Sequence, residues 1–348
     1  MSATEYAPTK DTGGPAQPLL IVKDLQKHFP VRGGLLGRTQ AKVQAVDGVS
    51  FEVKKGETLG IVGESGCGKS TTAKLLIGLT EKDKGDIIFD GLPLGRALPL
   101  KELRKGVQMV FQDSYATLNP RLTILDSVAF GARVQGLGDP QGLARKMMDR
   151  VGLDPDRFAH RYPHELSGGQ RQRVNIARAL AMSPRLVVLD EAVSALDKSV
   201  EAQVLNLLSD LRDEFGLTYI FISHDLNVVR YISDRILVMY LGEVVEVAPV
   251  DSIWQSQAHP YTRSLFGAMP SMDPENRTME PPLTGDPPNP INPPSGCRFH
   301  TRCRFASEIC KSKAPRLAGL AANAAHRVAC HLHDTGSGHP RAGQGVPE

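Results

Sequence analysis

Short apolar runs alternate with segments of helical periodicity along most of this chain. Six runs have the length and composition of strands, and they begin at Leu19, Val49, Thr58, Val107, Leu186 and Tyr219. Between the last two runs, apolar residues recur at the spacing of one helix face, at Val200, Val204, Leu208, Leu211 and Phe215. Short buried strands separated by helices predict an α/β fold with a largely parallel sheet.

A proline-rich stretch divides the chain by composition. Eight prolines fall within residues 271–295, which no regular element tolerates, so we expect a stiff, extended connector there. Residues 18–270 precede it as the main domain, and residues 296–334 follow it as a small cysteine-rich C-terminal extension. Residues 1–17 and 335–348 are polar and contain Gly and Pro, which predicts disorder at both ends.

The composition is that of an ordinary soluble globular protein. Of the 348 residues 41% are hydrophobic and 23% are charged, and the formal net charge is only +3. The whole-chain charge therefore does not point to nucleic acid or an anionic membrane as the main partner. The sequence has no apolar run of about 18 residues and no apolar core of a signal peptide, so we expect a cytosolic chain that does not span a membrane alone.

The segment GESGCGKS, from Gly63 to Ser70, lies between an apolar run and a segment of helical composition. This matches a nucleotide phosphate loop, in which backbone N–H groups cradle the phosphates, Lys69 reaches the β- and γ-phosphates and Ser70 offers its hydroxyl to Mg²⁺. Cys67 is interpreted as a small filler and not as a nucleophile. The expected nucleotide-binding residues here are Gly63, Glu64, Ser65, Gly66, Cys67, Gly68, Lys69, Ser70 and Thr71.

The apolar run LVVLDE ends in two adjacent carboxylates. Successive side chains on a strand point in opposite directions, so Asp190 and Glu191 are expected to do different jobs. Asp190 suits the Mg²⁺ shell, and Glu191 suits the general base that activates the attacking water. An acidic pair alone is usually a solvated strand end, but the phosphate loop upstream favours the functional interpretation.

The segment LSGGQRQR has the features of a second phosphate-binding loop, although it contains no lysine. Ser167 is a good N-cap, Gly168 and Gly169 leave backbone N–H groups open, and a polar helix-forming run follows. A polar helix cap accounts for Ser167 but not for the Gly-Gly-Gln that comes after it.

These motifs are followed by SALD, which begins at Ser194, and by the histidine after YIFIS. In this order they resemble the motifs of the ATP-binding subunit of an ATP-binding cassette (ABC) transporter. The resemblance covers about residues 19 to 250. It implies a P-loop NTPase fold with a RecA-like parallel sheet core, an antiparallel β subdomain and an inserted helical subdomain at roughly 113–182.

The resemblance also explains why one chain carries two such loops. In that family two subunits dimerise head to tail, and each ATP lies between one subunit's phosphate loop and the other's LSGGQ. The second loop then clamps the partner's nucleotide from the far side without a lysine, through Ser167, Gly168, Gly169 and Gln170.

Four more residues match positions of the family. Gln112 corresponds to the glutamine that reaches Mg²⁺ and signals to the membrane subunit, and His224 to the histidine that contacts the γ-phosphate. Phe29 corresponds to the aromatic residue that stacks on adenine, and Asp197 to the loop that couples the two ATP sites. The resemblance thus implies ATP and Mg²⁺ as cofactors, a metal shell of Ser70, Gln112 and Asp190, and catalytic roles for Glu191, His224, Lys69 and Gln112.

The segments IWQSQAHPYTRSLFGAMP and SGCRFHTRCRFASEIC resemble the C-terminal region of ATPases that drive dipeptide and oligopeptide importers. They imply an ATP hydrolase that energises peptide import across the bacterial inner membrane, peripheral on its cytoplasmic face. The implied partners are a second, related ATPase subunit, two transmembrane permease subunits and, indirectly, an extracytoplasmic solute-binding protein, with no nucleic acid. An identical ATPase partner stays open, as do other cargoes, because relatives with this tail move nickel, glutathione or other small solutes.

Two functions of other classes are alternatives. One is a soluble cassette ATPase in DNA repair or translation, but such proteins usually have a long coiled coil between the phosphate motifs, or two cassettes in one chain. This sequence has neither. The other is a non-catalytic regulatory module, against which Glu191 and His224 both argue.

Four cysteines near the C-terminal end are candidate metal ligands: Cys297, Cys303, Cys310 and Cys330, with 5, 6 and 19 residues between them. In a reducing compartment such a group suggests a metal sooner than disulfides. Tetrahedral zinc usually draws on pairs about two to four residues apart, and none of these gaps is that short. Similar tails in the peptide-importer family resemble iron–sulfur binders, which favours a [4Fe–4S] cluster, with zinc as the alternative.

Overall fold

A computed structural model describes residues 14, 16–33, 38–269 and 285–346. Most of the disorder expected at 1–17 and of the connector expected at 271–295 therefore lies outside the described residues. Within the described ranges, no helix combines the length and the apolar character that crossing a membrane requires.

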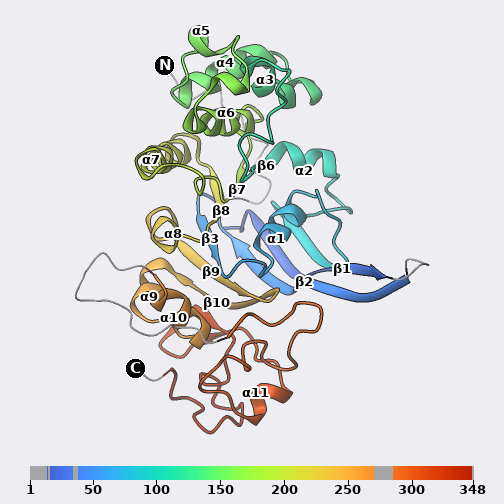
Figure 1. Ribbon diagram of the computed structural model, residues 1–348, viewed down its shortest axis with the longest axis vertical. Helices are drawn as coiled ribbons and strands as arrows, with labels where there is room; N and C mark the ends of the chain where they lie inside the picture. The colour runs from blue at the N-terminus through green and yellow to red at the C-terminus, as the bar shows by residue number, and fades with distance from the viewer. Residues whose placement is uncertain (1–13, 15, 34–37, 270–284, 347–348) are drawn as a thin grey trace.

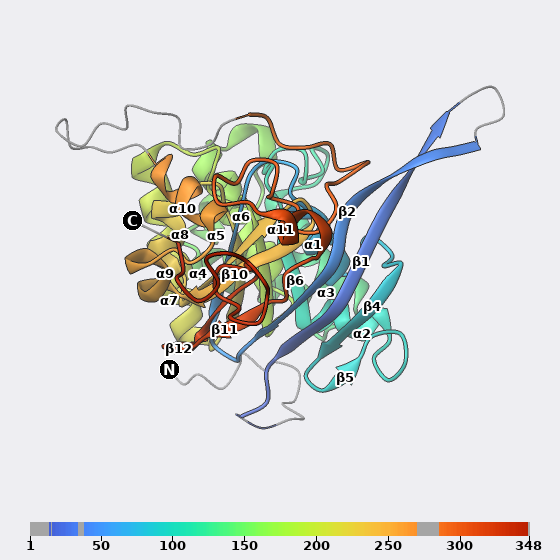
Figure 2. The same ribbon diagram turned by 90° about the horizontal axis from the view of Figure 1, so that it is seen from below.

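Two β-sheets form the body of the molecule (Figure 1). The smaller sheet is antiparallel and has the strand order β2-β1-β4-β5, with β1 (Leu20–Gly33), β2 (Arg38–Val53), β4 (Lys84–Phe89) and β5 (Leu92–Pro93). Figure 2 shows β1 and β2 as a long hairpin that extends away from the rest of the chain.

The larger sheet has the strand order β11-β12-β10-β9-β3-β8-β7-β6. It contains β3 (Thr58–Val62), β6 (Val107–Val110), β7 (Leu186–Asp190), β8 (Thr218–Ile222), β9 (Arg235–Tyr240), β10 (Glu243–Pro249), β11 (Ala318–Leu320) and β12 (Asn323–Val328). The strands from β6 to β9 run parallel, and β10, β12 and β11 continue the sheet antiparallel. The α/β fold expected from the apolar runs is confirmed, and each of the six runs contributes to a strand.

Both faces of the larger sheet are buried, which explains why its central strands are apolar without interruption. In β7, Val187 and Leu189 join one hydrophobic cluster, whereas Leu186 and Val188 join the cluster on the opposite face. Alternate side chains of a strand point to opposite faces, so a strand covered on both sides needs apolar residues at every position.

Helices cover the larger sheet, and α3 to α6 pack on one another at one end of the molecule, beyond β6 and β7 (Figure 1). This is the region in which the inserted helical subdomain is expected. The helices are α1 (Lys69–Leu76), α2 (Leu100–Gly106), α3 (Ile124–Val134), α4 (Pro140–Arg150), α5 (Pro155–Phe158), the 3-10 helix η1 (Pro163–Glu165), α6 (Gly168–Leu180), α7 (Lys198–Phe215), α8 (Leu226–Ile232), α9 (Val250–Gln255), α10 (Pro260–Gly267) and α11 (Glu308–Ser312).

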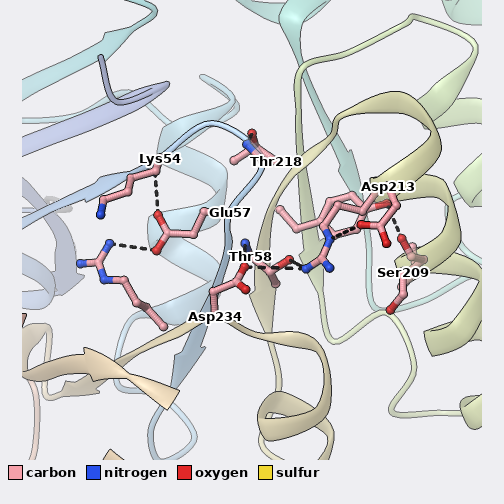
Figure 3. Close-up of polar contacts among 12 residues, drawn as sticks. Lys54, Glu57, Thr58, Ser209, Asp213, Thr218 and Asp234 are labelled. Atoms are coloured by element: carbon pink, nitrogen blue, oxygen red, sulfur yellow. Dashed lines mark hydrogen bonds and ion pairs between the residues drawn. The ribbon is translucent and has the colours of Figure 1, made fainter. Parts of the chain in front are cut away.

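A polar network holds the start of β3 between its neighbours (Figure 3). The buried Glu57 accepts a 2.7 Å hydrogen bond from the Lys54 amide and pairs with Arg235 at 3.0 Å. One residue on, the Thr58 amide donates to Asp234 at 2.7 Å. These contacts anchor the end of β3 opposite to the one that leads into the phosphate loop, so the strand presents that loop from a fixed base.

The cysteine-rich extension is joined to the main sheet and is not a separate body. Strand β12 pairs with β10, with Glu246 opposite Val328. The sequence predicts disorder from residue 335 onward, whereas the structure packs residues 335–346 in turns. Ser337 and His339 are buried there because their side chains hydrogen-bond to the carbonyl oxygens of His331 and Phe305, at 2.9 Å each.

Candidate nucleotide-binding site

The phosphate loop lies between the fully buried strand β3 and the start of α1. Its glycines are required by conformation and by space. Gly63 and Gly68 have φ angles of 149° and 108°. A Cβ on Gly63 would lie 2.2 Å from the carbonyl oxygen of Met239, and one on Gly68 would lie 2.2 Å from that of Ala45. Only glycine fits at these two positions, so the backbone N–H groups of the loop stay accessible to a ligand.

Lys69 is buried, and its ammonium group lies across the loop. Nζ donates to the carbonyl oxygens of Gly63 at 2.7 Å and of Glu64 at 3.0 Å. Cys67 is 3% exposed, and burial raises the pKa of its thiol, as expected for a packing residue rather than a nucleophile.

The carboxylate pair after β7 meets the phosphate loop. Ser70 Oγ donates to Asp190 Oδ1 at 3.0 Å, and burial raises the pKa of the Asp190 carboxyl. The adjacent Glu191 accepts a 2.8 Å hydrogen bond from Gln112 Nε2, and His224 Nδ1 lies 3.5 Å from the same Glu191 oxygen. Gln112 and His224 come from after β6 and after β8, so three neighbouring parallel strands contribute.

The alternation of strand side chains, from which different jobs for Asp190 and Glu191 are expected, does not extend to Glu191. Strand β7 ends at Asp190, and Glu191 has a φ of 49°, in the left-handed region. Strand alternation does not apply at that residue, so both carboxylates lie at the same site. A non-glycine residue in this conformation is uncommon and occurs often at functional sites.

A pocket of about 420 Å³ joins these groups. It is lined by parts of the phosphate loop with Gln112, Glu191 and His224, and also by Val43 and Ala45 of β2, which the sequence did not single out. Phe29, expected to stack on adenine, is 39% exposed and is not among the lining residues, but it pairs directly opposite Val43. The register of β1 against β2 decides which side chains face the pocket. The sequence does not reveal this register, because other residues separate the two strands.

The second loop lies apart from this pocket. Ser167 is exposed at the start of α6, its Oγ accepts from the Gln170 amide at 3.3 Å, and Gln170 Oε1 accepts from the Ser167 amide at 3.0 Å. A Cβ on Gly169 would lie 2.6 Å from a methyl group of Val200. Helix capping and packing therefore account for Gln170 and Gly169 as well as Ser167, which the sequence did not reveal.

The SALD loop continues from Glu191 toward α7. Ser194 Oγ donates to the carbonyl oxygen of Glu191 at 3.0 Å, and Asp197 is exposed at the start of α7. Ala192 and Val193, which lie between Glu191 and Ser194 in the chain, are buried in the hydrophobic core.

The four C-terminal cysteines surround a second, smaller cavity of about 20 Å³. None of them forms a disulfide, and burial raises the pKa of Cys297 and of Cys330 to about 12. Among the described residues, no group of three or more His, Cys, Asp or Glu side chains could hold a metal ion as they stand.

Fold and site together define a P-loop nucleotide-binding protein, and comparison with known proteins gives the family. The ABC transporter family model matches residues 46–194, and the model for the C-terminal region of oligopeptide/dipeptide transporters matches residues 245–310. The chain is 46% identical to the oligopeptide transport ATP-binding protein AppF of Bacillus subtilis, over 92% of this chain and 99% of that protein. It is 44% identical to the di/tripeptide transport ATP-binding protein DppF of Pseudomonas aeruginosa, over 90% of this chain and 97% of that protein.

Comparison with solved structures supports the same family. CbiO1 of Clostridium perfringens, part of an ABC transporter complex, matches with a TM-score of 0.59 and 28% identity over 69% of this chain and 92% of its own. The dimeric cassette MJ0796 bound to ADP and Pi matches with a TM-score of 0.57 and 30% identity over 66% of this chain and 98% of its own. The chain belongs to the ATP-binding subunits of ABC transporters and is an ATP hydrolase of that family.

Proposed function

We propose that ATP hydrolysis by this chain energises the import of di- and oligopeptides across the bacterial inner membrane. The match of residues 245–310 to the oligopeptide/dipeptide transporter C-terminal region carries this proposal, because the ATP site itself is common to ABC proteins of every cargo. Relatives named for oligopeptide and di/tripeptide transport match over nearly their whole length, which supports the same cargo class.

Reconstitution of the assembled transporter in vesicles tests the cargo. We expect uptake of a labelled peptide that requires ATP, the cognate binding protein and both permease subunits. Uptake of nickel or glutathione without uptake of any peptide would contradict the proposal and favour the alternative cargoes.

The proposed assembly places this chain on the cytoplasmic face, bound to two transmembrane permease subunits and to a second ATPase subunit of related but distinct sequence. The cargo would reach the permeases from an extracytoplasmic solute-binding protein. Co-purification from native membrane followed by mass spectrometry tests this, and recovery of this chain as the sole ATPase subunit would show an identical pair instead.

The chemistry follows from the arrangement of the site. The N–H groups of the phosphate loop and the Lys69 ammonium bind the phosphates. The oxygens of Ser70, Asp190 and Gln112 form a hard-ligand set that fits Mg²⁺, since Ser70 Oγ and Asp190 Oδ1 already lie 3.0 Å apart. When bound there, Mg²⁺ would offset the charge of the β- and γ-phosphates.

Glu191 is assigned the role of general base toward the attacking water. Gln112 and His224 both contact one of its carboxylate oxygens, so they orient the base and leave its other oxygen for the water. His224 is 64% exposed, which leaves its ring accessible to the γ-phosphate. Through Ser194 and Asp197, the SALD loop would couple the position of Glu191 to the second ATP site.

The loop at Ser167 is assigned to the partner's nucleotide. It is exposed and does not line this chain's own pocket. A Ser167→Arg subunit paired with an unmodified ATPase subunit should lose photolabelling by 8-azido-ATP at the unmodified subunit's phosphate loop, because an arginine there obstructs the γ-phosphate. Ser256→Arg, the same change on the exposed end of α9, serves as the control. Loss confined to the mutated subunit's own site would show that the geometry is wrong.

We also propose a [4Fe–4S] cluster at Cys297, Cys303, Cys310 and Cys330, with zinc as the alternative. Four thiols, one buried and three half-buried, that line one cavity and form no disulfide are a suitable donor set. A cluster places its thiolates around a cube and not around one ion, which suits thiols that surround a cavity without forming a single-ion site. The cavity has room for about one water, so the side chains would have to move apart.

Anaerobic purification should therefore yield brown protein with about four iron and four sulfide per chain. The variant with Cys67→Ala should keep this content, because Cys67 lies in the phosphate loop and does not line the cavity. Stoichiometric zinc without iron in the same preparation would overturn the cluster and leave the four ligands in place.

A further inference from the structure

The cysteine-rich extension makes a direct ion pair with the phosphate loop. Arg302 lies between Cys297 and Cys303 in the chain, and both of its terminal nitrogens donate to the Glu64 carboxylate, at 2.8 and 3.1 Å. The arginine side chain is 6% exposed and the glutamate side chain 21% exposed. A bidentate pair shielded in this way fixes the orientation of both groups.

Glu64 is the second residue of the phosphate loop, and its backbone is held as well. Its amide donates to the Tyr261 hydroxyl at 2.8 Å, and its carbonyl oxygen accepts from Lys69 Nζ at 3.0 Å. Glu64 thus contacts the extension through its side chain, α10 through its amide and the phosphate-binding lysine through its carbonyl oxygen. A displacement of Glu64 would move the lysine's own hydrogen-bond partner.

Aromatic packing closes the space between the loop and the extension. Phe299, 2% exposed, makes edge contacts with Tyr240 and Tyr261 at centroid distances of 5.3 and 5.5 Å. The Tyr240 hydroxyl also lies 3.4 Å from Arg302. This packing limits the access of water to the ion pair, which strengthens its electrostatic interaction.

The charge of Glu64 is unfavourable for the function of the loop. A carboxylate beside a triphosphate-binding site repels its ligand, and the repulsion grows where water is excluded. Arg302 supplies the opposite charge and draws the carboxylate toward the extension. We propose that Arg302 is a positioning residue of the ATP site, which neutralises Glu64 and holds the phosphate loop in its binding conformation.

This inference rests on the assignment of the phosphate loop as the ATP site. In the full-length chain within its transporter complex, Arg302→Gln should raise the Kd for ATP and the KM for hydrolysis about tenfold, while kcat at saturating ATP stays within about twofold. Arg302→Lys keeps the charge without the bidentate geometry and should recover part of the affinity. Arg304→Gln removes the same charge from an exposed neighbour whose ring contact is with Phe305, and should bind ATP normally.

A double-mutant cycle separates this role from general stability. In a Glu64→Gln background the repelling charge is gone, so Arg302→Gln should cost much less affinity than in the original chain. Equal losses in both backgrounds, or unchanged affinity in Arg302→Gln, would overturn the proposal. If Arg302→Gln does not fold, the same cycle is run with Arg302→Lys. Lys69→Ala serves as the reference: its failure to weaken binding would contradict the ATP site itself, not only Arg302.

Discussion

Glu191→Gln should reduce ATP hydrolysis by about 10²- to 10⁴-fold and leave ATP binding intact, which is the range expected for loss of a general base. Glutamine keeps the size of the side chain and its contacts with Gln112 and His224 but does not accept a proton from water. The loss should appear in kcat and not in the affinity for ATP. Phosphate release measures the first and equilibrium nucleotide binding the second.

The same variant should accumulate the closed ATP-bound dimer of ATPase subunits, because ATP hydrolysis, the step expected to reopen that dimer, is blocked. Size-exclusion chromatography with and without ATP reports this. Glu214→Gln, the same chemical change at a surface residue paired with Arg150, should hydrolyse ATP at the original rate. Normal turnover in Glu191→Gln would remove Glu191 from its assigned role.

Lys69→Ala should weaken ATP binding itself, by about 10- to 100-fold, which corresponds to about 1.5–3 kcal/mol for hydrogen bonds to a charged group. The ammonium group lies over the loop, and no other described side chain of the loop carries a positive charge. Isothermal titration with ATP and Mg²⁺ measures the change directly.

Lys101→Ala, an exposed lysine of α2, is the matched control and should bind ATP as the original chain does. Melting temperatures without nucleotide should be compared as well, since Lys69 is buried and its removal leaves space behind. Retained affinity in a folded Lys69→Ala protein would argue against the phosphate-loop assignment.

Features carried by contiguous residues could be predicted from the sequence. The loop from Gly63 to Ser70 is one such feature, because an apolar strand, a glycine-rich turn and a helix follow one another in a fixed order. The position of Phe29 could not be predicted, because it depends on the register of β1 against β2 across the intervening chain. The convergence of Asp190 and Glu191 depends on one left-handed residue, which no pattern of apolar positions reveals.

The C-terminal extension shows the same limit. Its composition does not show which of its polar side chains are buried, because their partners lie far away in the sequence. His326, 2% exposed, lies 2.6 Å from the fully buried Glu246 of β10, 80 residues earlier. Such a partner turns a polar residue into a buried one, and composition alone does not identify it.

The pairing of β12 with β10 bears on where this chain can be shortened. The family model for the C-terminal region stops at residue 310, before β11 and β12 begin. A chain cut there would leave β10 as an open edge strand, with unpaired backbone groups available to other chains, and would leave Glu246 without its histidine. Edge strands of this kind promote aggregation, so the minimal soluble cassette of this protein extends to at least Val328.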